Sequence, residues 1–209
     1  MSMIKIVDNL YRWRIDEAVK KLESKLDNEF YVTDLIYCPL KYRYQKIYKE
    51  LTISSAVNPT TLLGEFTHYG VEKILVDLFG SSNVRLEVDY ERGLEVDGVL
   101  YVVKGRVDAV ISDWIIEIKT SRFDISIPQN HHVMQTRIYL WLTGLTHALL
   151  LYITSNRIAE FIIDKPATDG EIADLIRGTI SGAPAPRYSW ECRFCIYATL
   201  CPNKKVSEV

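Results

Sequence analysis

Sulfur is scarce in this chain, and long apolar runs are missing. The 209 residues include 4 cysteines and 3 methionines. The longest apolar runs, such as "HALLLYIT", stop far short of the roughly 18 residues that a membrane-spanning helix needs. The start of the chain also lacks a basic segment followed by an apolar stretch and a small-residue cleavage site. These absences predict a soluble, cytoplasmic protein with no membrane partner.

An excess of charge of either sign is missing too. The 25 Lys and Arg residues nearly balance 27 Asp and Glu residues, for a formal net charge of -2. This balance excludes a protein that coats nucleic acid through bulk positive charge, although it leaves room for a local basic groove. The chain has no G-x-x-x-x-G-K-S/T pattern, so we expect no intrinsic helicase motor.

The composition and periodicity are those of a globular protein. Hydrophobic residues make up 48% of the chain, which is enough for a sizeable core. Apolar spacing predicts helices at roughly 14–27, 34–51, 60–79, 128–143 and 169–180, with Pro39 limiting the regularity of the second. Thr168 and Glu171 form a capping-box pattern for the last helix. Alternating, β-rich segments predict strands at roughly 84–91, 99–111, 114–120, 148–154 and 158–164.

This order of elements sets the expected fold class and the division of the chain. Helices, an antiparallel meander, a crossover helix and further strands imply an α/β fold with a mixed sheet flanked by helices. The densest loop signal, "SGAPAPRYSW" at 181–190, separates a core from a cysteine-rich tail. We therefore expect an N-terminal helical region over 1–58, a core over 59–180 and a C-terminal tail over 181–209.

The segment "GRVDAVISDWIIEIKTS" holds the strongest candidate for a catalytic site. Asp108 lies on one predicted strand and Glu117-Ile118-Lys119 on the next, with a turn between them. Alternation sends Glu117 and Lys119 to one face of the sheet and Ile118 to the other. Two carboxylates and an ammonium group at a strand end suit a site for a hard cation. The alternative is a salt-bridged hairpin edge, where Glu-x-Lys pairs are common.

Three residues on predicted helices add to this candidate. His68 would be a nitrogen ligand beside the carboxylates and would shift the metal preference towards manganese. Gln135 and Tyr139 lie at i and i+4, so an amide and a phenol share one helical face. Each of the three could instead be an ordinary core or surface residue. We do not choose His131 and His132 as ligands.

The stretch "YCPLKYRYQKIYK" interleaves cations with aromatic rings. Cations that follow a phosphate backbone and rings that stack on bases are what proteins use to bind single-stranded nucleic acid. The candidate DNA-binding residues are therefore Lys41, Arg43, Tyr44, Lys46, Tyr48 and Lys49. The alternative is a solvated helix whose tyrosines pack inside the protein.

The cysteines comprise one upstream residue and a downstream group of three, namely Cys38, Cys192, Cys195 and Cys201. The short C-x-x-C spacing, in a reducing compartment, favours a shared metal or cluster over disulfides. Four thiolates suit an iron–sulfur cluster, and zinc accepts the same set. Both interpretations stay open on spacing alone.

Taken in chain order, the motifs resemble those of a known nuclease family. The pattern Gly64-x-x-x-His68, Gly105-x-x-Asp108, Glu117-x-Lys119, Gln135-x-x-x-Tyr139 resembles that of the RecB-like nucleases of the restriction-endonuclease-like superfamily. With one cysteine before these motifs and three after them, the chain is similar to the CRISPR-associated RecB-like exonucleases, the fourth Cas family. The resemblance runs from about Cys38 to Cys201.

The resemblance implies a restriction-endonuclease-like core and a metal-dependent DNA exonuclease. Its expected substrate is single-stranded DNA, degraded from 5′ to 3′ during CRISPR spacer acquisition, in antiviral defence. The expected ligands of a Mn²⁺ or Mg²⁺ ion are His68, Asp108, Glu117 and the carbonyl of Ile118. The expected catalytic residues are Asp108, Glu117, Lys119, Gln135 and Tyr139.

The resemblance also implies a cofactor and partners. Cys38, Cys192, Cys195 and Cys201 would hold a structural iron–sulfur cluster of the 4Fe–4S type that clasps the N-terminal region to the tail. The CRISPR integrase complex is the expected protein partner, and a homo-oligomer is compatible with the resemblance. The motifs also permit a RecB-like repair nuclease outside CRISPR, or a non-catalytic DNA-binding assembly subunit.

Overall fold

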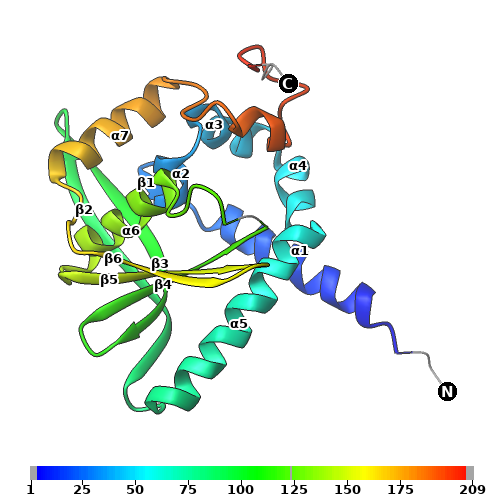
Figure 1. Ribbon diagram of the computed structural model, residues 1–209. Helices are drawn as coiled ribbons and strands as arrows, with labels where there is room; N and C mark the ends of the chain where they lie inside the picture. The colour runs from blue at the N-terminus through cyan, green and yellow to red at the C-terminus, as the bar shows by residue number, and fades with distance from the viewer. Residues whose placement is uncertain (1–3, 123, 206–209) are drawn as a thin grey trace.

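The computed structural model describes residues 4–122 and 124–205, and it shows a mixed β-sheet covered by helices (Figure 1). The strands are β1 (Glu29–Tyr31), β2 (Val84–Val96), β3 (Val99–Ile111), β4 (Trp114–Ser121), β5 (His147–Thr154) and β6 (Ile158–Ile163). The α-helices are α1 (Ile6–Glu23), α2 (Val32–Ile36), α3 (Pro39–Ile47), α4 (Lys49–Ser54), α5 (Pro59–Phe79), α6 (Asn130–Thr143) and α7 (Asp169–Ser181). Two short 3₁₀ helices are η1 (Ser55–Val57) and η2 (Glu191–Phe194). In the part of the chain described, no helix is long and apolar enough to cross a bilayer.

The sheet combines a meander with a parallel crossover. Its strands follow the order β1-β3-β4-β5-β6, and β2 pairs with β3. The β2–β3 turn uses Asp97 and Gly98, whose φ angles of 54° and 79° suit a tight hairpin. After the crossover through α6, β5 lies parallel to β4, and β6 lies antiparallel to β5. The predicted α/β class with a mixed sheet is confirmed.

Each face of the sheet buries its own core. On one face, α5 covers a cluster that contains Leu75, Val84, Ala109, Ile116 and Ile118. On the other face, α2, α6 and α7 enclose a larger cluster that includes Phe30, Leu35, Val107, Ile115, Ile138 and Ile176. A Cβ atom at Gly105 of β3 would lie only 2.7 Å from Cε1 of Tyr139. The lack of a side chain at Gly105 therefore lets α6 approach the sheet.

The N-terminal third differs from the predicted helices. The single helix predicted at 34–51 is wrong, because α2, α3 and α4 occupy that stretch. Pro39 has no amide hydrogen and begins α3, while Cys38 before it is extended with ψ of 123°. Tyr48, with φ of -112° and ψ of 66°, separates α3 from α4. The first helix begins and ends earlier than predicted, and β1 was not predicted.

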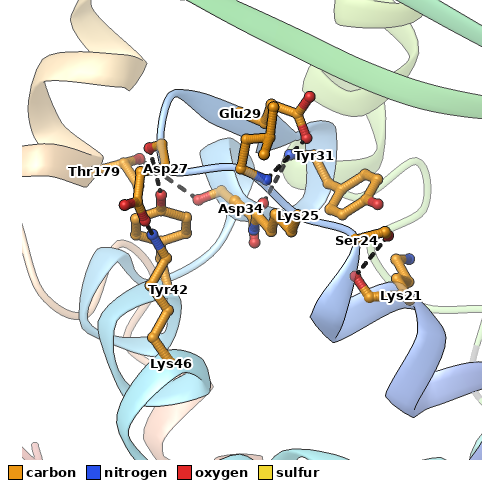
Figure 2. Close-up of polar contacts among 11 residues, drawn as sticks. Lys21, Ser24, Lys25, Asp27, Glu29, Tyr31, Asp34, Tyr42, Lys46 and Thr179 are labelled. Carbon is orange, nitrogen blue, oxygen red and sulfur yellow. Dashed lines mark hydrogen bonds and ion pairs between the residues drawn. The ribbon is translucent and has the colours of Figure 1, made fainter.

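Polar contacts attach the N-terminal region to the sheet at the end of α1 (Figure 2). Oδ2 of Asp34 accepts hydrogen bonds from Nζ of Lys25 at 2.5 Å and from the N–H of Tyr31 at 2.7 Å. Strand β1 pairs in parallel with residues 102–104 of β3. Three residues of the predicted N-terminal helical region therefore belong to the core sheet, and the boundaries at 58 and 181 stay predictions.

Helix α7 begins with the predicted capping box. Oγ1 of Thr168 accepts the N–H of Glu171 at 3.2 Å, and Oε2 of Glu171 accepts the N–H of Thr168 at 2.8 Å. Arg137 of α6 donates to the same Glu171 oxygen at 2.8 Å. The Glu171 carboxylate therefore caps the start of α7 and links it to α6.

Candidate functional site

The candidate site lies at a fork in the sheet. Strands β3 and β4 pair only from Ala109 to Ile111 and from Trp114 to Ile116. Beyond that ladder, β4 continues along β5, while β3 continues along β2. Asp108 and Glu117 are the first residues past the ladder on the two diverging strands. Their backbones no longer pair with each other, so their side chains can meet in the opening.

The structure brings four of the predicted residues together at this fork. Oδ2 of Asp108 accepts the N–H of Ile118 at 2.7 Å, and its Oδ1 lies 3.4 Å from Nδ1 of His68 on α5. Nζ of Lys119 donates to Oε1 of Glu117 at 2.5 Å. Ile118 itself is buried in the core under α5, so the predicted alternation of Glu117, Ile118 and Lys119 is confirmed.

One oxygen of Glu117 has no partner. The residue is 1% exposed, and its Oε2 is buried without a hydrogen-bond partner among the described residues. A buried carboxylate oxygen in this state costs free energy unless a ligand or ion satisfies it. The fork therefore has the donor set of a cation site, with one nitrogen from His68 and oxygens from Asp108 and Glu117.

Charges at the fork shift one another's pKa values. Burial, reinforced by the Asp108 carboxylate, raises the pKa of Glu117 to about 7. Burial would lower the pKa of Lys119, but the Glu117 and Asp108 carboxylates outweigh it and raise that pKa. The pKa of His68 is likewise raised, because Asp108 outweighs burial. Lys119 therefore stays an ammonium ion at neutral pH.

Among residues 4–122 and 124–205, no three His, Cys, Asp or Glu side chains lie close enough together to form a metal site as they stand.

Gln135 and Tyr139 occupy one buried face of α6, as their spacing predicts. Nε2 of Gln135 donates to the Tyr139 hydroxyl at 2.9 Å. Burial, with the Glu117 carboxylate adding to it, raises the pKa of Tyr139 well above its ordinary value. Tyr139 therefore stays neutral near the fork. Its predicted role in orienting Lys119 stays a prediction.

Glu72 is a residue that the sequence analysis missed. It lies one turn after His68 on α5, is 4% exposed, and its Oε1 is buried without a hydrogen-bond partner among the described residues. Burial and the adjacent Glu87 carboxylate raise the pKa of Glu72 to about 7. The i+4 spacing from His68 was the available signal, but an acid on a helix is usually exposed.

The four cysteines line a single cavity of about 500 Å³ between α3 and the C-terminal tail. All four are free thiols and are half-buried. In Figure 1, the red C-terminal segment lies beside α3 and α4. Burial raises the pKa values of Cys38 and Cys195, so a cation or cluster would be needed to hold these groups as thiolates.

Protein contacts alone already close this cavity. Glu191 is buried, and its Oε1 accepts the N–H of Cys38 at 2.7 Å while its Oε2 accepts the N–H of Tyr188 at 2.9 Å. Nε of Arg187 donates to the carbonyl of Tyr37 at 2.9 Å. The tail is thus held against the segment around Cys38. The sequence analysis missed Glu191 because its partner lies 153 residues away.

Most of the predicted DNA-binding residues have partners within the protein. Arg43 donates to the carbonyl of Ile180 at 2.6 Å, and Lys46 donates to Asp27 at 2.8 Å. The rings of Tyr44 and Tyr48 pack against Tyr197, with centroids 5.7 and 6.4 Å away. Lys41 lines the cysteine cavity, and Lys49 is exposed. Packing against Tyr197 accounts for the positions of Tyr44 and Tyr48. Contact of the six residues with DNA stays a prediction.

Comparisons with known proteins give one strong sequence match. No family model matches the chain. A curated protein of Saccharolobus solfataricus, the CRISPR-associated exonuclease Cas4, is 43% identical over 195 residues. The match covers 88% of this chain and 95% of that protein.

Solved structures extend the match to the fold. The crystal structure of SSO0001 superposes with a TM-score of 0.91 at 40% identity, covering 96% of this chain and 98% of that one. An alkaline exonuclease from Laribacter hongkongensis reaches a TM-score of 0.49 at 12% identity, covering 82% of this chain and 90% of that one. A similarity as low as that of the alkaline exonuclease says nothing about the function of this chain.

Proposed function

The chain belongs to the family of CRISPR-associated exonucleases named Cas4 and is a nuclease, and on that premise we propose a specific activity. The protein degrades single-stranded DNA from the 5′ end, with the help of a divalent cation, during CRISPR spacer acquisition. The buried oxygen of Glu117 that has no hydrogen-bond partner among the described residues, near Asp108 and His68, supports the cation in this proposal, and the similarity to Cas4 supports the exonuclease activity and the CRISPR role.

In this proposal, His68, Asp108 and Glu117 hold the cation, together with the carbonyl of Ile118. The bound Mn²⁺ or Mg²⁺ ion would polarise the scissile phosphate and help to form hydroxide from water. The imidazole of His68 favours manganese over magnesium, which prefers oxygen ligands. The N–H of Ile118 fixes the direction of the Asp108 carboxylate before any ligand arrives.

Lys119 acts on the charge that develops at phosphorus. Its ammonium group is held beside Glu117 and stays protonated because both carboxylates raise its pKa. A fixed positive charge in a buried site stabilises a phosphorane-like transition state more than a solvated one would. Gln135 and Tyr139 line the same side of the fork and would orient Lys119 or the phosphate.

The four cysteines would hold a 4Fe–4S cluster with a structural role. Support comes from four free thiols on one cavity, which joins α3 to the tail. Zinc is the rival occupant, since it takes the same ligands. The basic residues Lys41 and Lys49 lie on or beside α3, so a cluster that fixes α3 would also fix a path for the DNA backbone.

The remaining parts of the proposal concern place and partners. We place the protein in the cytoplasm, where four unpaired thiols are the expected state of cysteine. The CRISPR integrase complex is the proposed partner, and co-purification of the two tests this. Light scattering of the same preparation measures the oligomeric state.

End-labelled DNA tests the activity. Purified wild-type protein should shorten single-stranded DNA in Mn²⁺ or Mg²⁺ and should stop when a chelator removes the cation. Asp108→Asn should lower the rate by a factor of about 100 or more. The matched control is Asp113→Asn, an exposed acid in the β3–β4 turn, which should cleave normally. Full cleavage by Asp108→Asn would show that the fork is not the active site.

Iron and sulfide assays test the cluster. Anaerobically purified wild type should contain both, in proportion to protein, and Cys38→Ala should contain neither. If the protein contains zinc instead of iron, a zinc ion takes the place of the cluster in this proposal. The four cysteines would still join α3 to the tail. If Cys38→Ala keeps the full complement of iron and sulfide, Cys38 is not a ligand of the cluster and the shared site is wrong.

A further inference from the structure

Trp190 of the C-terminal tail is held in place by other rings and is nevertheless exposed. Its indole stacks on the ring of Tyr188, with centroids 5.9 Å apart and planes at 14°. The ring of His131 lies 5.0 Å away, and the ring of Tyr37 meets it edge-on at 6.4 Å. Even so, 40% of Trp190 is exposed. An indole that its neighbours already fix loses little freedom when a flat ligand stacks on it.

A continuous series of contacts links Trp190 to the catalytic fork. Tyr152 of β5 is the partner of Lys119 of β4 in their parallel ladder, so the two side chains share one face of the sheet. The hydroxyl of Tyr152 lies 2.7 Å from Nδ1 of His132. The rings of His132 and His131 are 4.1 Å apart, and His131 contacts Trp190. Packed side chains therefore form one wall from Lys119 to the indole.

Helix α5 passes both the cysteine cavity and the fork, and so it sets the distance between them. Thr61, in its first turn, lines the cavity together with Trp190. A Cβ atom at Gly64 would lie 3.4 Å from Oγ1 of Thr120 on β4, and His68 is at the fork. Thr61 and His68 are about 10 Å apart along the helix axis, at 1.5 Å per residue. A DNA strand covers that length with about three nucleotides or fewer.

Two basic side chains flank this path. Lys41 lines the cavity with Trp190, and its Nζ lies 5.2 Å from the centroid of the Tyr37 ring. Arg122 is exposed and donates to Oγ1 of Thr60 at 3.3 Å, at the beginning of α5. Cations for the phosphates beside an aromatic face for a base are what proteins use to bind single strands. The four thiols would hold the cluster, but they give no role to Lys41 and Trp190 in the same cavity lining.

We propose that Trp190 stacks on one base of the single-stranded DNA, within about three nucleotides of the bond that is cut at the fork. This inference rests on the proposed function and names a nucleobase as the ligand of the subsite. The stack accepts any base, because every base has a π-face. Lys41 and Arg122 contact the neighbouring phosphates. If Trp190 instead only covers the cysteine cavity, its substitution cannot depend on which base of the DNA is present.

A single abasic site, moved along an oligonucleotide, tests the inference. With wild type, the first cleavage should slow by a factor of about 10 when the abasic site lies at one position near the cut bond, because one stack is lost. Trp190→Leu should cleave the intact oligonucleotide about 10-fold more slowly and should no longer respond to the abasic site. Trp190→Phe keeps a ring and should keep the response. Trp13→Leu, at an α1 tryptophan that is 41% exposed, is the matched control and should behave like wild type.

The outcomes separate a base stack from a structural role. Equal rates for every abasic position in wild type, or an unchanged position-specific loss in Trp190→Leu, overturn the inference. Iron and sulfide in Trp190→Leu should match wild type, which distinguishes loss of the stack from loss of the cluster.

A photochemical measurement on wild type needs no variant. Iodouracil at the sensitive position should cross-link to Trp190 on irradiation, and a cross-link to another residue overturns the inference even if Trp190→Leu does not fold. If wild type cleaves no single-stranded DNA, the proposed function is contradicted, and the cross-link to the uncut strand still decides whether Trp190 binds a base.

Discussion

The fork and the cysteine cavity both gather residues from distant parts of the chain, but they are built in different ways. At the fork, long strands and the 21-residue α5 position the side chains, the N–H of Ile118 fixes Asp108, and Lys119 fixes Glu117. The cavity is made of short helices and loops, and its thiols are half-buried. The fold organises the first site, whereas the second depends on Glu191 and on what the cysteines bind.

This difference indicates that the fork matters mainly for activity and the cavity mainly for stability. Unpaired charge at the fork makes the metal-free protein less stable, since like charges repel there. The cavity brings residue 38 together with residues 192–201, so the proposed cluster would cross-link the chain over a long loop and stabilise the folded state. Substitutions at the fork should therefore abolish activity with little loss of stability. Substitutions at the cavity should instead lower stability first and activity only afterwards.

The largest expected effect is that of Cys38→Ala on stability. Removing one thiolate should release the tail and lower the free energy of unfolding by about 3 kcal/mol or more, as loss of a native long-range cross-link does. Asp108→Asn should stay as stable as wild type or become more stable, because it removes a repelling charge. Anaerobic thermal unfolding with visible absorbance measures both. If Cys38→Ala and Asp108→Asn lower the free energy of unfolding equally, the proposed difference between the cavity and the fork is wrong.

Lys119→Met tests whether the fork separates cation binding from charge stabilisation. The substitution should lower turnover by a factor of about 100 while Mn²⁺ binding persists, because the ammonium acts on the transition state. Lys73→Met, on the exposed face of α5, is the matched control. A wild-type rate for Lys119→Met would reduce Lys119 to a salt-bridge partner of Glu117.

Glu191→Gln tests how far the cavity is closed by the protein itself. The two backbone N–H groups would lose a charged acceptor, at a cost of about 2 kcal/mol for the pair. Unfolding of the protein with its cysteine site emptied should show this loss most clearly. If Glu191→Gln unfolds like wild type under that condition, Glu191 does not hold the tail.

The smallest expected effect is that of pH on Glu171, which belongs to neither region. Arg137 and the cap at Thr168 lower the pKa of Glu171 to about 2. A lowered folded-state pKa means that the stabilisation is complete above the ordinary pKa of Glu and is lost as pH falls towards 2. Because the side chain is 37% exposed, the effect at pH 6 should be about 1 kcal/mol or less.

Comparing wild type with Glu171→Gln measures that effect. The difference in unfolding free energy should be present at pH 6 and should shrink steadily on acidification. Any loss of stability on acidification that both proteins share comes from other groups, such as Glu29 and Asp97, whose pKa values are also lowered. A difference that grows as pH falls contradicts the assignment of the ion pair with Arg137.

The parts of the molecule that could be predicted rest on local patterns. Alternation placed Glu117 and Lys119 on one face, because it depends only on residues near in sequence. The capping box of α7 needed only Thr168 and Glu171. The four cysteines were recognised as a set because the chain has no other cysteine.

The parts that could not be predicted depend on distant partners. Strand β1 has three residues, too few for periodicity, and exists because residues 102–104 of β3 offer an open edge. Glu72 looks like an ordinary helix-surface acid until β2 is folded against α5. Glu191 acquires its role from the backbone of Cys38. The prediction of one helix over 34–51 was wrong because Pro39 and Tyr48 break the helix, although the apolar spacing of the sequence continues through both residues.

The order of the cysteines along the chain has a consequence for biosynthesis. Cys38 leaves the ribosome first, and 162 more residues are made before Cys201 follows, which takes roughly 10 to 30 s at ordinary rates. The sheet and the fork can fold during that interval. Delivery of the proposed cofactor to all four thiols would therefore come last, onto a domain that is already folded. Glu191, made just before Cys192, would close the cavity in time to receive it.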